Sequence, residues 1–344
     1  MKPFPRLFVF PVFILLLATV LTAEEAEPLA PYQPPANSTQ TLRLWGSRNM
    51  DALVHAWAQA YRVAHPEVNF EIKLLGNGTA MPALYLGLAD LAFFSRDLIV
   101  TDVDGFAHVR KYNPLRVELA TGSAEDPGHA PALVLLVHRD NPLTRLSLRQ
   151  VDAIFSAPRR RGASAAIRTW GQLGLTGEWT DQPIHLYGDD AQSMTALFFQ
   201  RAALGNSHRM NWEHFTEFGD LRRADGTVVT AAQQTSAALK TDRYGLAISS
   251  LHYLTKELKP LALAEKDSGL FYEPTKVNIA ARRYPLSRPV FVCADQPPGR
   301  PLDPKVRDFL YFVLGAAGQQ MIVRDGSYLP LTTEAAREEL SKLP

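Results

Sequence analysis

The sequence has little cysteine, no excess of charge of one sign and, after its first residues, no long apolar run. Cys293 is the only cysteine, which excludes a disulfide within the chain, and we interpret its thiol as a small packed side chain. Lys and Arg number 36 against 35 Asp and Glu, so the formal net charge is +1. This balance argues against the broad basic surface that nucleic-acid binding needs, and any anion site must be local.

The common signatures of catalysis are also missing. The chain has no Gly-x-Ser-x-Gly elbow for a serine nucleophile and no His-Glu-x-x-His pattern for zinc. Its central histidines are scattered, which favours surface or packed positions for them: His185, His208, His214 and His252. We therefore predict no enzyme, no catalytic residue, no metal ligand and no cofactor, with a phosphatase as the enzymatic alternative.

The N-terminus has the pattern of a secretory signal peptide, predicted over residues 1–23. Lys2 and Arg6 precede the apolar stretch 7–21, and small residues follow. The alternative is a membrane anchor, but the stretch is shorter than the roughly 20 residues that a spanning helix needs. Residues 24–40 are rich in Pro, Ala and Glu and are predicted to form a flexible leader. The prediction is an exported, periplasmic protein.

The length of 344 residues and a hydrophobic content of 46% are enough for two domains. The first domain opens with a β–α–β pattern: a strand at 41–45, a helix at 50–65 and a strand at 68–75. Ser47 follows the first strand and Gly76 the second. Because parallel strands end at the same edge of a sheet, where ligands bind in α/β proteins, both turns are expected at one site.

Residues 74–98 carry the clearest anion-site pattern. A loop, 76–80, is predicted before a helix at 82–88, with Pro82 in the tolerated first turn. Glycine lets a ligand approach the backbone, and a helix start presents free N–H groups to an anion. The alternative is that Thr79 only caps the helix. The strand 91–94 then ends at Ser95-Arg96-Asp97.

The second half of the chain repeats this arrangement once. A buried strand is predicted at 131–137 and a helix at 148–155, capped by Ser147. A strand at 183–187 leads into a polar turn that carries Ser193 and Thr195 before a helix at 196–203. Here too, simple capping by Ser193 is the alternative to a ligand site.

Seven segments of the chain form a characteristic series: GSRNM (46–50), GNGTA with GLADLAFFSRDL (76–98), ALVLLVHRDNP (132–142), GDDAQSMTALFF (188–199), DRYGLAI (242–248), YPLSRP (284–289) and GQQ with GSYLPL (318–331). Together they resemble one family, the phosphate-binding periplasmic proteins of ABC transporters. No single segment is specific, but their order matches that family across residues 41–331.

The resemblance implies an α/β fold of the two-lobed periplasmic-binding-protein type II, each lobe a mostly parallel sheet flanked by helices. Lobe I is expected at 41–135 and again at 271–344, and lobe II at 136–270. The implied function is capture of phosphate or a related oxyanion for ABC-type uptake. The implied partners are the anion and an inner-membrane permease, with no nucleic acid, and the protein is expected to be a monomer.

The resemblance also implies a set of ligand-binding residues from three turns. Hydroxyl and backbone N–H groups surround the anion in that family, and an acidic side chain accepts a phosphate proton. Asp97 is the candidate for the acid. The predicted ligand-binding residues are Ser47, Arg48, Gly78, Thr79, Ser95, Asp97, Ser193 and Thr195.

The third turn departs from the family pattern Gly-Arg-Asp-x-x-Ser-Gly-Thr. Asp189 stands where the arginine is expected, and Met194 stands where a glycine is expected. A lost charge-assisted bond is worth about 1.5–3 kcal/mol. Two explanations stay open. Arg48 supplies the charge from the opposite lobe, or the altered pocket serves a sensor, a scavenger or another ligand or protein partner.

Overall fold

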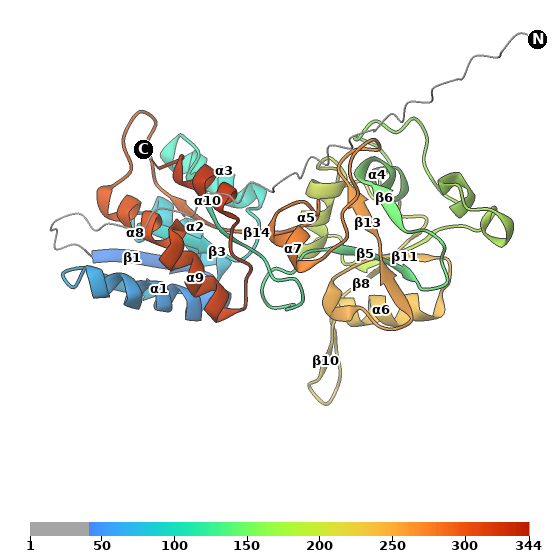
Figure 1. Ribbon diagram of the computed structural model, residues 1–344, viewed down its shortest axis with the longest axis horizontal. Helices are drawn as coiled ribbons and strands as arrows, with labels where there is room; N and C mark the ends of the chain where they lie inside the picture. The colour runs from blue at the N-terminus through green and yellow to red at the C-terminus, as the bar shows by residue number, and fades with distance from the viewer. Residues whose placement is uncertain (1–40, 344) are drawn as a thin grey trace, which may run out of the picture.

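The computed structural model describes residues 41–343 and divides their main strands between two five-stranded sheets. Figure 1 shows the sheets and their helices as two lobes side by side. We call the lobe that holds 41–121 and 289–343 lobe I, and the other lobe II. The predicted signal peptide and leader lie outside the described residues.

The sheet of lobe I has the strand order β2-β1-β3-β14-β4. The first three of these strands are parallel, whereas β14 runs antiparallel to both its neighbours. A strand from late in the chain therefore fills the place between two early ones. The strands are β1 (Thr41–Gly46), β2 (Asn69–Lys73), β3 (Leu91–Phe94), β4 (Leu115–Thr121) and β14 (Pro289–Ala294).

Helices cover both faces of this sheet because its central strands are apolar on both sides. Along β3, Leu91 and Phe93 face one core, and Ala92 and Phe94 face the other. This is the period of two that a strand imposes. The first core packs against α1 (Asp51–Ala64), α8 (Pro304–Leu314), α9 (Ala316–Asp325) and α10 (Thr333–Leu340), and the second against α2 (Asn77–Tyr85) and α3 (Val100–Arg110).

The start of α2 differs from the predicted one. The helix begins at Asn77, so most of the predicted loop is its first turn, and Pro82 lies inside the helix. The proline lacks an N–H and cannot bond the carbonyl of Gly78 four residues earlier. Gly78 is exposed, so water can satisfy that carbonyl. Gly76 precedes the helix with φ +133°, a conformation that glycine adopts readily.

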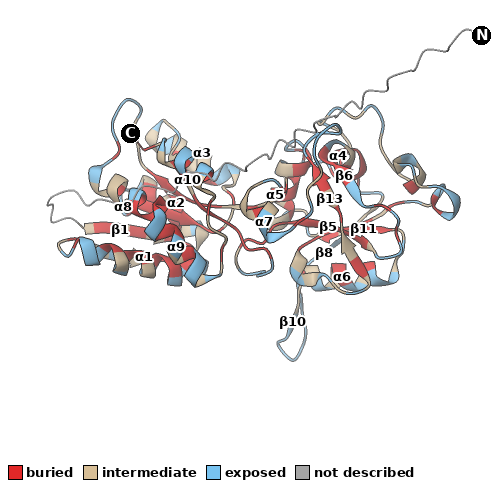
Figure 2. Ribbon diagram, in the orientation of Figure 1, coloured by how far each residue is buried: buried red, intermediate tan, exposed pale blue. Residues whose placement is uncertain are grey.

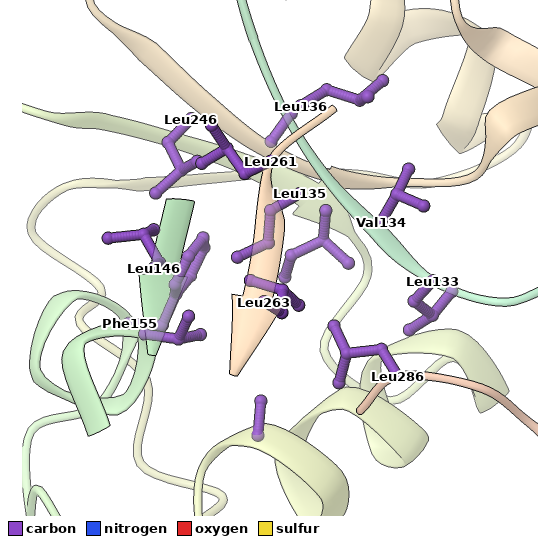
Figure 3. Close-up of a cluster of buried hydrophobic side chains, with 14 of the residues drawn as sticks. Leu133, Val134, Leu135, Leu136, Leu146, Phe155, Leu246, Leu261, Leu263 and Leu286 are labelled. Atoms are coloured by element: carbon purple, nitrogen blue, oxygen red, sulfur yellow. The ribbon is translucent and has the colours of Figure 1, made fainter. Parts of the chain in front are cut away.

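The sheet of lobe II has the order β12-β5-β11-β7-β8. Its strands β7, β8 and β11 are parallel, and β5 is antiparallel to β11 and β12. Figure 3 shows Leu135 of β5 on the same side of the sheet as Leu146, Phe155 and Leu263, with which it shares the core of this lobe. The strands are β5 (Val134–His138), β7 (His185–Asp189), β8 (Phe215–Phe218), β11 (Gly245–Ser249) and β12 (Leu258–Pro260).

Four helices and two small ribbons complete lobe II. Ser147 accepts a hydrogen bond from the N–H of Gln150 at 3.1 Å, which confirms the predicted cap. An exposed ribbon of β9 (Leu221–Arg222) and β10 (Val228–Val229) projects from the lobe (Figure 2). The other elements are α4 (Leu148–Phe155), α5 (Met194–Ala203), α6 (Ala231–Thr241), α7 (Lys276–Ala280), β6 (Arg145–Ser147) and β13 (Ala262–Ala264).

Two chain segments connect the lobes and lie side by side. The N–H of Gly122 donates to the carbonyl of Arg288 at 2.7 Å, and that of Leu133 donates to the carbonyl of Leu286 at 3.1 Å. Tyr284 and Leu286 pack in the core of lobe II. The predicted lobe boundaries stay predictions. We propose from these contacts that the chain crosses at 122–133 and 281–288.

The architecture confirms the predicted α/β, two-lobed fold. The predicted helices at 50–65 and 148–155 match α1 and α4 within one residue. Within residues 41–343, no helix has the length and apolarity that a membrane crossing requires.

Candidate functional site

The crossing segments join the two sheets at the edges where ligands bind in α/β proteins. In lobe I, Ser47 and Ser95 directly follow β1 and β3, and Thr121 of β4 pairs with Pro289 of β14 at the same edge. In lobe II, Ser249 at the end of β11 pairs with Val134, where the first crossing segment enters β5. The carboxyl ends of the parallel strands in both lobes therefore border the crossings.

In lobe I three polar side chains meet at this edge, and we call them the serine cluster: Ser47, Asn77 and Ser95. The two hydroxyl oxygens of Ser47 and Ser95 are 2.6 Å apart, and both residues are buried. The amide oxygen of Asn77 accepts from the N–H of Ser95 at 3.2 Å, and its Nδ2 donates to the Ser95 hydroxyl at 3.4 Å. The structure thus brings together two predicted site residues, and it adds Asn77.

The start of α2 lies directly beside this cluster because Asn77 is its first residue. Gly78 and Thr79, both predicted ligands, stand in the first helical turn, where backbone N–H groups have no carbonyl four residues earlier within the helix. The N–H and the hydroxyl of Thr79 both donate to the carbonyl of Gly76, at 3.1 and 2.9 Å, and close the turn. No carboxylate occupies that turn, and the helix dipole there favours an anion.

Arg48 follows Ser47 in a short 3-10 helix, η1 (Arg48–Met50), and is exposed. The Asn49 amide next to it donates to the carbonyl of Gly128 in the first crossing segment. Tyr328 donates to the Asn49 carbonyl at 3.0 Å. These contacts fix the first turn of lobe I against the crossing, with the Arg48 side chain on the outside.

Asp97 is buried but lies among arginines rather than in the serine cluster. Its carboxylate forms ion pairs with Arg116 of β4, at 3.6 Å, and with Arg201 of α5. Because α5 belongs to lobe II, the second pair links the lobes. The neighbouring Arg96 pairs with Asp102 at 2.6 Å. The predicted role of Asp97 as a proton acceptor stays a prediction.

In lobe II the corresponding edge holds a cavity of about 280 Å³ with several polar side chains in its lining, which we call the hinge cavity. It is bordered by the ends of β7 and β11, the first turn of α5 and both crossing segments. The residues used below are Asp189, Thr195, Ser249, Ser250 and Arg288. The hydroxyls of Ser249 and Ser250 and the Nε of Arg288 are buried and have no hydrogen-bond partner among the described residues.

Opposite charges lie on two walls of the hinge cavity. Burial raises the pKa of the Asp189 carboxyl, and a hydrogen bond from Thr195 partly offsets this effect. Burial lowers the pKa of Arg288 to about 10, and attraction to Asp189 works against that shift. Arg288 therefore stays protonated at neutral pH, while Asp189 holds its proton more readily than an ordinary aspartate.

Ser193 and Thr195, the predicted site residues of the third turn, have different surroundings in the structure. Ser193 caps α5 by accepting from the N–H of Ala196 at 3.1 Å, as the capping alternative predicts. Thr195 points into the hinge cavity, whereas Met194 lines a second, more apolar cavity of about 340 Å³ between the lobes, with Phe198 and Arg201. Met194 therefore does not line the hinge cavity.

No group of three or more His, Cys, Asp or Glu residues that could hold a metal ion occurs within residues 41–343. The polar groups of the serine cluster and the hinge cavity are instead hydroxyls, amides and one buried guanidinium, together with the carboxylates of Asp189 and Asp220. The hydroxyl, amide and guanidinium groups can bind an oxyanion by hydrogen bonds and charge.

Four residues of the serine cluster and the hinge cavity were not predicted as site residues from the sequence. Asn77 lies in the predicted loop 76–80, because the helix is predicted to begin at residue 82, whereas α2 begins at Asn77. Ser249 and Ser250 form no spaced motif, and Arg288 was noted only within the family segment 284–289. The one available signal was a pair of serines at the end of an apolar run, 245–248.

A model of the PBP superfamily domain matches residues 32–317. The phosphate-binding protein PstS of Pseudomonas aeruginosa is 34% identical over 321 residues, which cover 92% of this chain and 91% of that protein. Protein SphX of Synechocystis is 22% identical over 305 residues, covering 88% of this chain and 81% of that protein.

Two solved structures share the fold. PstS from Borrelia burgdorferi has a TM-score of 0.56 at 17% identity and covers 86% of this chain and 100% of its own. An ABC-type phosphate transport receptor from Vibrio cholerae has a TM-score of 0.52 at 21% identity, with coverage of 84% and 100%.

Proposed function

The chain belongs to the PBP superfamily, and from that premise and its kinship with PstS we propose that it captures inorganic phosphate between its two lobes. The family resemblance predicted from the sequence is confirmed. The altered-pocket alternative, with a sensor or scavenger role, is not favoured, because a relative identical at 34% over nearly the whole chain is a phosphate-binding protein.

The observation that supports the proposal best is the pairing of two polar strand edges across the crossing segments. The serine cluster and the start of α2 offer hydroxyl and N–H donors from lobe I. The hinge cavity offers hydroxyls and a guanidinium from lobe II. Phosphate has four oxygens to accept such bonds, and we propose that one anion bridges both lobes once they close.

Binding by this arrangement requires no covalent step. Closure of the lobes around the anion would exclude water and strengthen each charged hydrogen bond. We propose that the closed form delivers phosphate to an ABC permease. We also propose that the chain acts in the periplasm, after export directed by residues 1–23.

The predicted ligands from the sequence enter this proposal with unequal support. Ser47 and Ser95 lie together at the cleft edge, Gly78 and Thr79 lie at the adjoining helix start, and Thr195 points into the hinge cavity. By contrast, Ser193 is engaged in capping α5. Arg48 and Asp97 are placed around the cleft rather than in either cluster.

Calorimetric titration with phosphate and with sulfate tests the proposal. The chain is first freed of bound ligand by unfolding and refolding. We expect a phosphate Kd in the micromolar range or tighter, and at least tenfold weaker binding by Ser95→Ala. Ser164→Ala, in an exposed loop of lobe II, is the matched control. No heat with millimolar phosphate would refute the proposal.

A further inference from the structure

Arg288 occupies an unusual place for a charged side chain. It lies on the second crossing segment, directly before β14, and only 7% of its surface is exposed. Its carbonyl accepts the 2.7 Å bond from Gly122 of the first crossing segment. The backbone at Arg288 is therefore held between the two chains that connect the lobes.

The positive charge of the Arg288 guanidinium has no ion-pair partner within residues 41–343. It lies over the ring of Phe198, with 5.3 Å between its central carbon and the ring centroid. Its Nε has no hydrogen-bond partner among the described residues, and Asp189 attracts it across the cavity without forming an ion pair with it. A buried cation with unused donors is unfavourable unless an anion reaches it.

Two more unused groups border the same cavity. Ser249 and Ser250 are each 5% exposed, and their hydroxyls are buried without a partner in the described chain. Buried hydroxyls are normally hydrogen-bonded in proteins. The residues that carry these two hydroxyls and the unpartnered Nε of Arg288 line one cavity of about 280 Å³.

We propose that Arg288 is the cationic ligand of the bound phosphate in this chain, and that Ser249 and Ser250 donate hydrogen bonds to the same anion. This inference rests on the proposed function. It moves the compensating charge from Arg48, the sequence-based candidate, to the second crossing segment. The carboxylates of Asp189 and Asp220 line the same cavity, and Arg288 is the one cation among its described lining residues that can offset them beside a bound anion.

The assignment also connects ligand binding with the crossing segments. An anion that bonds to Arg288 contacts the segment about which the lobes must move. Loss of this contact should therefore weaken phosphate binding more than loss of one hydroxyl at the rim of lobe I.

Calorimetry on the full chain and its variants tests the inference. We expect Arg288→Gln to weaken phosphate binding at least a hundredfold and Arg288→Lys about tenfold, because lysine keeps the charge but loses the planar fork. Arg161→Lys is the control. Arg161 is a half-buried arginine of lobe II that pairs with Glu265 at 2.8 Å, and its change should leave the phosphate Kd within twofold.

A second variant keeps the inference testable even if the Arg288 variants do not fold. Ser249→Ala with Ser250→Ala removes two unpartnered hydroxyls, so the ligand-free protein should melt at the same or a higher temperature. Phosphate binding should nevertheless fall at least tenfold. A wild-type protein that binds no phosphate would refute the proposed function itself. A wild-type protein that binds phosphate, with serine variants or folded Arg288 variants of unchanged affinity, would refute this inference alone.

Discussion

The substitution Asn77→Asp should leave the stability of lobe I nearly unchanged but should weaken its binding of an anion. Asn77 is the first residue of α2, and its amide oxygen accepts the 3.2 Å bond from the N–H of Ser95. Aspartate is almost the same shape and keeps that acceptor. It also places a negative charge at the helix start, which is worth about 0.3–1 kcal/mol of stability.

The same substitution loses the Nδ2 donor, whose bond to the Ser95 hydroxyl is long at 3.4 Å. A neutral hydrogen bond contributes about 0.5–1.5 kcal/mol. The gain and the loss nearly cancel. We therefore expect the free energy of unfolding, measured by urea titration of the ligand-free protein, to change by no more than about 1 kcal/mol.

The affinity for phosphate should change far more. Two like unit charges about 4 Å apart near a protein surface repel by about 4 kcal/mol, and each 1.4 kcal/mol is tenfold in Kd. Even half of that repulsion weakens binding by more than about tenfold. Calorimetry should therefore show a phosphate Kd raised by at least tenfold, and less so in high salt.

Asn69→Asp is the matched control because Asn69 is exposed at the amino end of β2, the opposite edge of the sheet. It adds the same charge and should leave the phosphate Kd within about twofold. Unchanged or tighter phosphate binding by Asn77→Asp would show that the anion does not lie at the start of α2.

Two other perturbations probe the fold. Asp90 is desolvated, but its bonds to Arg43 and its ion pair with Lys305 hold its pKa below the ordinary value of 3.8. Its contribution to stability is therefore complete above that pH and is lost as pH falls through the lower, folded pKa. Asp90→Asn should cost about 1–3 kcal/mol in urea titrations at pH 7, and the deficit should shrink towards pH 3; a deficit independent of pH would contradict this. Burial raises the pKa of the Cys293 thiol to about 12, so a thiol reagent should modify it only after unfolding. Rapid labelling of the native protein at pH 8 would contradict the buried position.

Helices could be predicted best from the sequence where the spacing of the apolar residues and a capping residue indicate the same helix. The helix at 148–155 shows both, because Ser147 precedes it and its buried residues recur at helical spacing. By contrast, the sequence predicts no helix at the position of α3. It carries Gly105 and charged residues around one buried aromatic, Phe106, so its apolar face is too narrow to give a period.

Some of the predicted site residues lie close together because they follow strands in sequence. Ser47 and Ser95 meet because β1 and β3 are parallel neighbours, whose carboxyl ends lie at the same edge of the sheet. The hinge cavity could not be predicted in this way. Arg288 and Ser250 are separated by nearly forty residues, and only the return of the chain through the second crossing segment places them at one cavity.

The position of β14 has a consequence for the order in which the protein can fold. Lobe II comes from one continuous stretch, so its sheet can pair as soon as residues up to 260 are available. The sheet of lobe I cannot, because β14 pairs with both β3 and β4 and begins at residue 289. Until that strand arrives, β3 and β4 each present an open edge to other chains. Lobe I should therefore be the last part to form and the one most exposed to aggregation, and a truncation before residue 289 should leave lobe II folded but lobe I incomplete.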